Sequence, residues 1–143
     1  MQQNQIVSTK TLSFPIATVW NAYASENLIR TWWGPHGFTN TFEKFEFQEG
    51  GEWIFTMISA DGIEFPNIII FKEIVPEKRI FLEHIPAPHF FAEIDFTSEG
   101  EMTHILFTMT FDSIEQCEAV KKYALNGNEE NFERLEALLE KIS

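Results

Sequence analysis

Apolar residues recur along the chain with two different spacings, and the spacing changes near Phe38. Within residues 16–23 they recur at intervals of three, four and seven, which is typical of a helix that buries one face. Pro15 suits the first turn of such a helix. A second short helix is predicted over residues 25–32. It ends at Gly34-Pro35, because glycine and proline both interrupt the helical hydrogen-bond pattern.

After Phe38 apolar and polar residues alternate, which is the pattern of half-buried strands. Gly50-Gly51 and Asp61-Gly62 mark hairpin turns, and Pro66 indicates an edge position or a bulge near the start of its strand. With one earlier strand included, the predicted strands cover residues 9–14, 38–48, 53–57, 63–74, 80–85, 90–97 and 102–111. Consecutive strands joined by short turns predict an antiparallel sheet.

The C-terminal residues lack this alternation and are rich in Glu, Leu, Lys and Asn. A helix is predicted to begin at Asp112-Ser113 and to be interrupted at Asn126-Gly127-Asn128, where Asn128 is a candidate N-cap for a final helix. That final helix carries an apolar stripe of Phe132, Leu135, Leu138, Leu139 and Ile142. Such a stripe requires a sheet to cover it.

Length and composition indicate one globular domain over residues 1–143. The chain has 143 residues, is 44% hydrophobic and carries a formal net charge of −12. The apolar content is high enough for a single core, and the length leaves little room for a second domain. The acidic balance argues against partners such as duplex nucleic acid or anionic membranes, because both are bound through clustered Lys and Arg.

Cysteine usage and the N-terminal residues favour a cytoplasmic protein. Cys117 is the single cysteine and cannot form an internal disulfide, and the first residues lack the basic and apolar regions of a secretory signal. No apolar stretch approaches the ~20 residues that a membrane span requires.

Several motifs occur in an order that resembles a known superfamily. They are Val19-Trp20, Leu28 followed by Trp32-Trp33-Gly34-Pro35 and Gly37-Phe38, Gly50-Gly51-Glu52-Trp53, and the segment from Phe71 to Ile80. The chain thereby resembles the START-like helix-grip (SRPBCC) superfamily, and within it the single-domain relatives of the activator of the heat-shock-protein-90 ATPase. The resemblance implies an α+β fold in which a curved antiparallel sheet of about seven strands and two short helices wrap around a long C-terminal helix.

The resemblance also implies an apolar cavity between the sheet and the C-terminal helix. Members of the superfamily use this cavity for small hydrophobic ligands, and in a few branches it is an active site without a universal catalytic set. We therefore expect a module that binds or carries a small hydrophobic molecule, without a cofactor. The expected pocket residues are Trp32, Trp33, Trp53, Phe55, Met57, Phe71, Leu82, His84, Phe107, Met109, Phe132, Leu135 and Leu139.

Two other functions are also compatible with the sequence. One is an enzyme of the cyclase or hydrolase type, in which His84 acts as acid–base; the other is a chaperone-associated protein-interaction domain. His84 is the one catalytic candidate. No orienting partner for it is visible in the sequence, and it also suits a partly exposed position at a strand end near Pro86. A homodimer is compatible with all three functions.

Other polar and aromatic groups have simpler interpretations. His84 and His89 lie near Glu83 and Glu93 but lack the three or four ligands at the spacing of a zinc site, so no metal is expected. Alternation places Glu93 and Asp95 on the solvent face. The pair Trp32-Trp33 either closes the mouth of the cavity or fills the gap between the short helices and the sheet.

Overall fold

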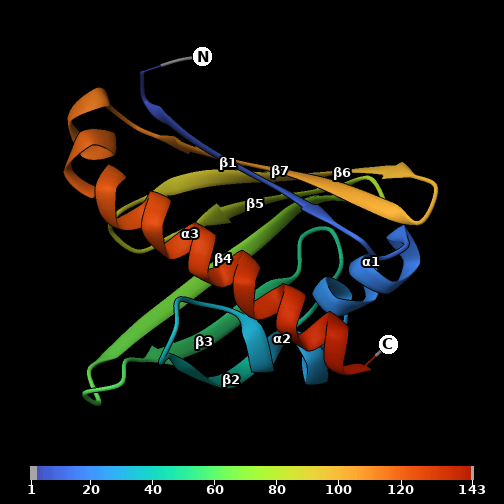
Figure 1. Cartoon of the computed structure of the whole chain (residues 1–143). Helices are drawn as coiled ribbons and strands as arrows, with labels where there is room; N and C mark the ends of the chain where they lie inside the picture. The colour runs from blue at the N-terminus through green and yellow to red at the C-terminus, as the bar shows by residue number, and fades with distance from the viewer. Residues whose placement is uncertain (1–2, 143) are drawn as a thin grey trace.

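The computed structural model describes residues 3–142, and in it one curved sheet packs against one long helix and two short ones (Figure 1). The strands are β1 (Gln5–Leu12), β2 (Thr39–Phe45), β3 (Glu52–Ile58), β4 (Glu64–Val75), β5 (Arg79–His84), β6 (Phe90–Glu99) and β7 (Met102–Phe111). The helices are α1 (Ile16–Ala24), α2 (Glu26–Trp32) and α3 (Ile114–Ile142). The predicted α+β helix-grip architecture is confirmed.

The sheet is antiparallel throughout, with the strand order β1-β7-β6-β5-β4-β3-β2. Strands β2 to β7 form the predicted meander, and β1 returns to pair with β7 at the opposite edge. Register shifts between Phe42 and Lys44 and between Phe71 and Glu73 mark irregularities of the bulge type. Bulges bend a strand and increase its twist, which helps the sheet to curl around α3.

Pro66 occupies a local edge of an otherwise internal strand. It pairs with Thr56 of β3, whereas the pairing of β4 with β5 begins only at Ile69. Proline cannot donate a backbone hydrogen bond, so it is tolerated where its strand has a neighbour on one side. The prediction of an edge position near the start of this strand is therefore confirmed for this segment, although β4 as a whole is internal.

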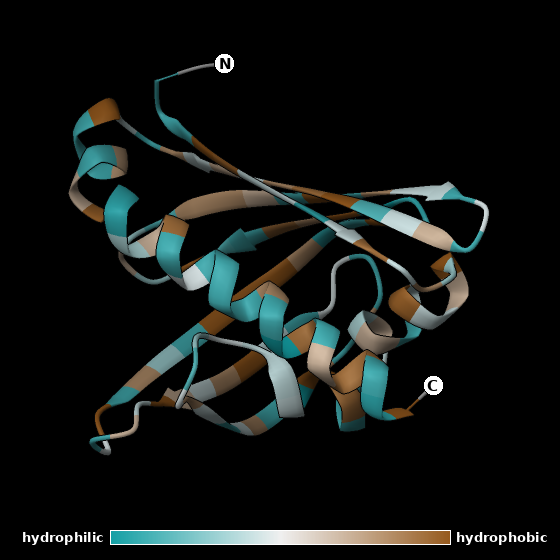
Figure 2. Ribbon diagram, in the orientation of Figure 1, coloured by the Kyte–Doolittle hydropathy of each residue, from teal (hydrophilic) through white to brown (hydrophobic). Residues whose placement is uncertain are grey.

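The two faces of the sheet carry different side chains. Trp53, Phe55, Phe71 and Leu82 are buried on the face that α3 covers. On the outer face, Arg79 forms hydrogen-bonded ion pairs with Glu73 (2.8 Å), Glu93 (3.3 Å) and Asp95 (3.1 Å). In Figure 2, hydrophilic residues follow the side of α3 that is turned away from the sheet. Strand alternation and helix amphipathicity thus place the core between sheet and helices.

The C-terminal helix corrects one sequence prediction, because α3 runs without interruption through Asn126-Gly127-Asn128. These residues do not form a turn; they lie within the helix and contact other elements. The Asn128 amide donates to Ser8 Oγ (3.2 Å), and a Cβ at Gly127 would lie 3.5 Å from Pro35 Cγ, so the helix passes close to the loop after α2. The weak helix propensity of Asn and Gly is overridden by this packing.

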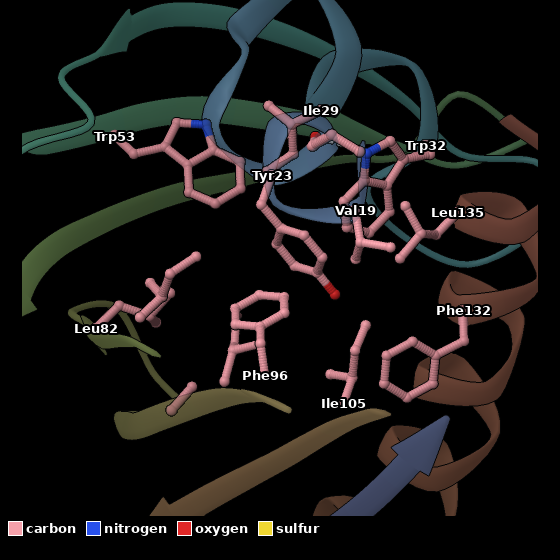
Figure 3. Close-up of a cluster of buried hydrophobic side chains, with 14 of the residues drawn as sticks. Val19, Tyr23, Ile29, Trp32, Trp53, Leu82, Phe96, Ile105, Phe132 and Leu135 are labelled. Carbon is pink, nitrogen blue, oxygen red and sulfur yellow. Dashed lines mark hydrogen bonds between the residues drawn. The ribbon is translucent and has the colours of Figure 1, made fainter. Parts of the chain in front are cut away.

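The core is densely packed around the C-terminal half of α3 (Figure 3). Tyr23 lies edge-on to Trp32 at 4.8 Å and to Phe96 at 5.1 Å between ring centroids. The Trp32 indole donates to the carbonyl oxygen of Ala22 at 3.0 Å. Burial raises the pKa of the Tyr23 hydroxyl well above its usual range. This end of the molecule is therefore closely packed, with voids of only about 10 Å³ beside Tyr23.

Candidate functional site

A cavity of about 320 Å³ lies at the other end of the molecule, between the sheet and the segment of α3 around residues 120–131. Strands β3 to β7 form one wall, and α3 and the loop after α2 form the other. Aromatic and aliphatic side chains provide most of the lining, among them Phe55, Met57, Ile69, Leu82, Phe90, Phe107, Met109 and Phe111. Tyr123, which is 88% exposed, also lines the cavity, so the cavity reaches the surface beside α3.

The position of the cavity follows from side-chain size along α3. The helix presents Phe132, Leu135 and Leu139 to the sheet in its C-terminal half, and these fill the space beneath them. Nearer its N-terminus it presents Ala124 and Gly127 at the cavity wall. Small residues leave space that the facing sheet side chains do not close, and a void forms there.

The expected pocket residues divide between the cavity and the core. Seven of them line the cavity: Trp33, Phe55, Met57, Leu82, His84, Phe107 and Met109. The other six lie in the packed core: Trp32, Trp53, Phe71, Phe132, Leu135 and Leu139. The tryptophan pair is divided in the same way, because Trp33 faces the cavity and Trp32 fills the space between α1, α2 and the sheet.

His84 and Asn67 form a polar pair in this apolar wall. His84 Nε2 lies 2.7 Å from Asn67 Oδ1, and its Nδ1 lies 3.0 Å from the carbonyl oxygen of Pro88. The imidazole stacks on Phe90 with 4.6 Å between ring centroids. Desolvation by burial lowers the pKa of His84, against hydrogen bonds to the carbonyls of Pro88 and Pro86 that raise it.

Asn67 is a functional candidate that the sequence analysis missed. It is 9% exposed and lies on the same face of β4 as Ile69 and Phe71. The alternation of this strand could have identified it, because Asn67 is two residues before Ile69 and therefore points into the core. A single amide among buried apolar side chains needs hydrogen-bond partners there. Two further amides, Asn128 and Asn131, line the cavity from α3.

Loop residues 33–35 line the cavity and are fixed by α3. The Asn131 side chain accepts from the backbone N–H of Gly34 (3.0 Å), and Arg134 donates to the carbonyl oxygens of Trp33 (3.2 Å), Gly34 (3.0 Å) and Pro35 (2.9 Å). Gly34 has a φ of +103°, a conformation that side chains with a Cβ rarely adopt. The lip of the cavity is thus held by hydrogen bonds from one helix.

His89 lies outside the cavity in a cluster of charged groups. Its Nε2 is 2.7 Å from Glu83 Oε2, its Nδ1 is 2.9 Å from Asp112 Oδ1, and Lys72 also contacts Glu83 at 3.1 Å. Over residues 3–142, no group of three or more His, Cys, Asp and Glu is arranged to hold a metal ion. The cluster links β4, β5 and the loop before β6 to the start of α3.

Replacing His89 by Gln should reduce the dependence of stability on pH. Hydrogen bonds that His89 donates to the carboxylates of Glu83 and Asp112 raise the pKa of His89 in the folded state. A histidine whose pKa is raised on folding stabilises the folded state fully at pH values below its pKa in the unfolded chain, about 6.5. This stabilisation is lost as the pH rises through its pKa in the folded protein. Urea unfolding between pH 5.5 and 8.5 should therefore show a smaller fall in stability for His89→Gln than for the wild type. An equal decrease in the free energy of unfolding for the variant and the wild type would show that the cluster does not couple folding to protonation.

The fold and the cavity define a helix-grip protein of the START-like class. Within that class, the chain belongs to the family described as Activator of Hsp90 ATPase homolog 1-like protein, whose model matches residues 13–140. No curated protein matches the chain. Among residues 3–142, no helix has both the length and the apolar character needed to cross a membrane.

Solved structures of similar fold come from several bacteria. A protein from Nitrosomonas europaea is 19% identical, with 99% of this chain and 97% of that chain covered and a TM-score of 0.89. A protein from Arthrobacter aurescens is 21% identical, with coverage of 97% and 87% and a TM-score of 0.89. An AHSA1-like protein from Aeromonas hydrophila is 17% identical, with coverage of 96% and 93% and a TM-score of 0.76. At these identities the likeness concerns the fold.

Proposed function

We propose that the protein binds or carries a small hydrophobic molecule in the cavity between the sheet and α3. The observation that supports this proposal is the cavity itself, whose walls are mostly apolar and whose polar groups are few. Its volume of about 320 Å³ lies at the lower end of the ~300–1,000 Å³ of small-molecule sites. The fold is also one whose members commonly bind hydrophobic ligands.

The composition of the walls indicates what such a molecule would gain. Burial of apolar surface is worth roughly 25 cal/mol per Å², and aromatic walls such as Phe55, Phe90 and Phe107 offer flat surfaces for ring contacts. No Asp, Glu, Lys or Arg occurs among the cavity-lining residues of the described chain. The cavity therefore favours a compact apolar body with few polar groups.

The proposal is tested with the neutral fluorescent probe N-phenyl-1-naphthylamine. We expect saturable binding with one probe per chain, a blue-shifted emission from the apolar site, and an increase in the unfolding temperature as the probe concentration rises. Absence of saturable binding, together with an unchanged unfolding temperature, would contradict the proposed function.

A further inference from the structure

The hydrogen bonds around His84 require more protons than a neutral imidazole can provide. Four groups form a chain: the Pro88 carbonyl, the His84 ring, the Asn67 side chain and the Phe65 carbonyl, with separations of 3.0, 2.7 and 2.9 Å. The two carbonyls at the ends only accept. His84 must therefore donate from Nδ1 at one end, and Asn67 must donate from Nδ2 at the other.

The middle contact then joins His84 Nε2 to Asn67 Oδ1, which also only accepts. Reversing the Asn67 amide does not help, because its oxygen would then face the carbonyl of Phe65 at the 2.9 Å contact. All three contacts are satisfied only when His84 carries a proton on both ring nitrogens. With a neutral ring, one of the three contacts brings two acceptors together.

Among the described residues that line the cavity, none carries a negative charge to balance that cation, and the nearby carboxylates of Glu83 and Asp112 bond His89. Among the described cavity-lining residues the other titratable group is Tyr123 of α3, and Asn67 and Phe90 face His84 from β4 and β6. His89, in the loop that follows β5, acts on His84 with a like charge that lowers its pKa. The wall thus combines a hydrogen-bond pattern that favours the imidazolium with a site that lacks an anion.

We propose that the hydrophobic ligand carries a carboxylate, or an equivalent acidic group, which balances the charge of His84 inside the cavity. The inference rests on the proposed function. Binding of such a ligand takes up to one proton from solvent onto the His84 ring, while the ligand stays ionised. Opposite charges within a few ångströms favour each other's charged forms, most strongly where water is excluded. His84 and Asn67 then determine specificity, and the apolar walls contribute affinity.

The test compares naphthalene-2-carboxylate with naphthalene-2-carboxamide as competitors of the neutral probe. The two differ in charge and have nearly the same shape. The wild type should bind the carboxylate several-fold more tightly than the amide near pH 6, and the factor should approach the tenfold of a one-unit pKa change as the pH falls towards 5. This preference should decline towards about pH 8, where His84 is neutral in the free protein. Equal affinities near pH 6 would overturn the inference.

Three variants separate the role of His84 from a general effect of charge. His84→Gln should abolish the preference for the carboxylate and its dependence on pH. Asn67→Asp places a carboxylate next to the ring, and should abolish the preference because the charge is then balanced within the protein. His104→Gln removes a histidine on β7 that bonds Thr11 and does not line the cavity, and should leave the preference intact. Retention of the preference in His84→Gln would overturn the inference.

A measurement on the wild type does not depend on how the variants fold. In the NMR titration of the His84 ring protons, the carboxylate should raise the pKa of His84 by about one unit and the amide should leave it unchanged. An unchanged value with bound carboxylate would overturn the inference. Failure of the neutral probe to bind would instead contradict the proposed function, so the two failures are distinguishable.

Discussion

Replacing Arg134 by Met should destabilise the protein by roughly 2–3 kcal/mol, a large effect for a residue that is partly exposed. Besides its three bonds to loop 33–35, the guanidinium donates to the carbonyl oxygen of Thr31 at 3.0 Å. These carbonyls lie in and just after the last turn of α2, where the helix cannot satisfy them internally. Met keeps the apolar stem but removes the donors. Urea unfolding at constant pH measures the loss.

Arg30→Met is the matched control, because it removes the same charge from an exposed pair. Arg30 contacts Glu26 at 2.7 Å one turn away on α2 and also lies over the Phe42 ring, 5.4 Å from its centroid. The ion pair contributes about 0.3–0.5 kcal/mol and an exposed cation–π contact about 0.5–1 kcal/mol, so the loss should stay below that of Arg134→Met. Arg134→Met should also weaken binding of the neutral probe, because the loop that it releases lines the cavity. Equal destabilisation by the two variants would contradict the role given to Arg134.

The second large effect is expected from filling the cavity. Ala92 on β6 lines the cavity between its strand neighbours Leu82 and Met109. In Ala92→Leu the added carbons occupy space that a ligand would use, so the affinity for the neutral probe should fall at least about tenfold, equivalent to 1.4 kcal/mol. Stability should stay the same or rise, because a void is filled instead of a packed core being enlarged.

Ala17→Leu is the control for this substitution. Ala17 is exposed on α1, away from the residues that line the cavity, and the same change there should leave probe affinity unaltered. Titration of probe fluorescence measures both variants. Unchanged affinity in Ala92→Leu would mean that the probe binds elsewhere on the protein.

The sequence predicts the sheet well because strand alternation is local. Each strand from β2 to β7 shows a period of two, and short turns leave few ways to connect neighbours. The helix break predicted at Asn126-Gly127-Asn128 was wrong, because the continuity of α3 there depends on long-range contacts. What keeps α3 continuous is contact with Ser8 and Pro35, residues about ninety or more positions away, and local propensity contains no information about them.

The cavity was harder to predict than the fold. Periodicity shows that Phe71 and Leu82 point to the same face, but whether each meets a ligand or a helix depends on the facing side chains. The small residues Ala124 and Gly127 decide this, and their position opposite the sheet is set by the tertiary structure. The role of Arg134 could not be predicted from the sequence, since its carbonyl partners lie about a hundred residues earlier.

The most direct test of the account is a crystal structure of the complex with N-phenyl-1-naphthylamine. We predict density for one probe between α3 and the sheet, in contact with Phe55, Leu82 and Phe107. Density confined to the exposed apolar residues Ile63 and Phe65, which are 53% and 46% exposed, with the cavity empty, would contradict the claim that this cavity is the binding site.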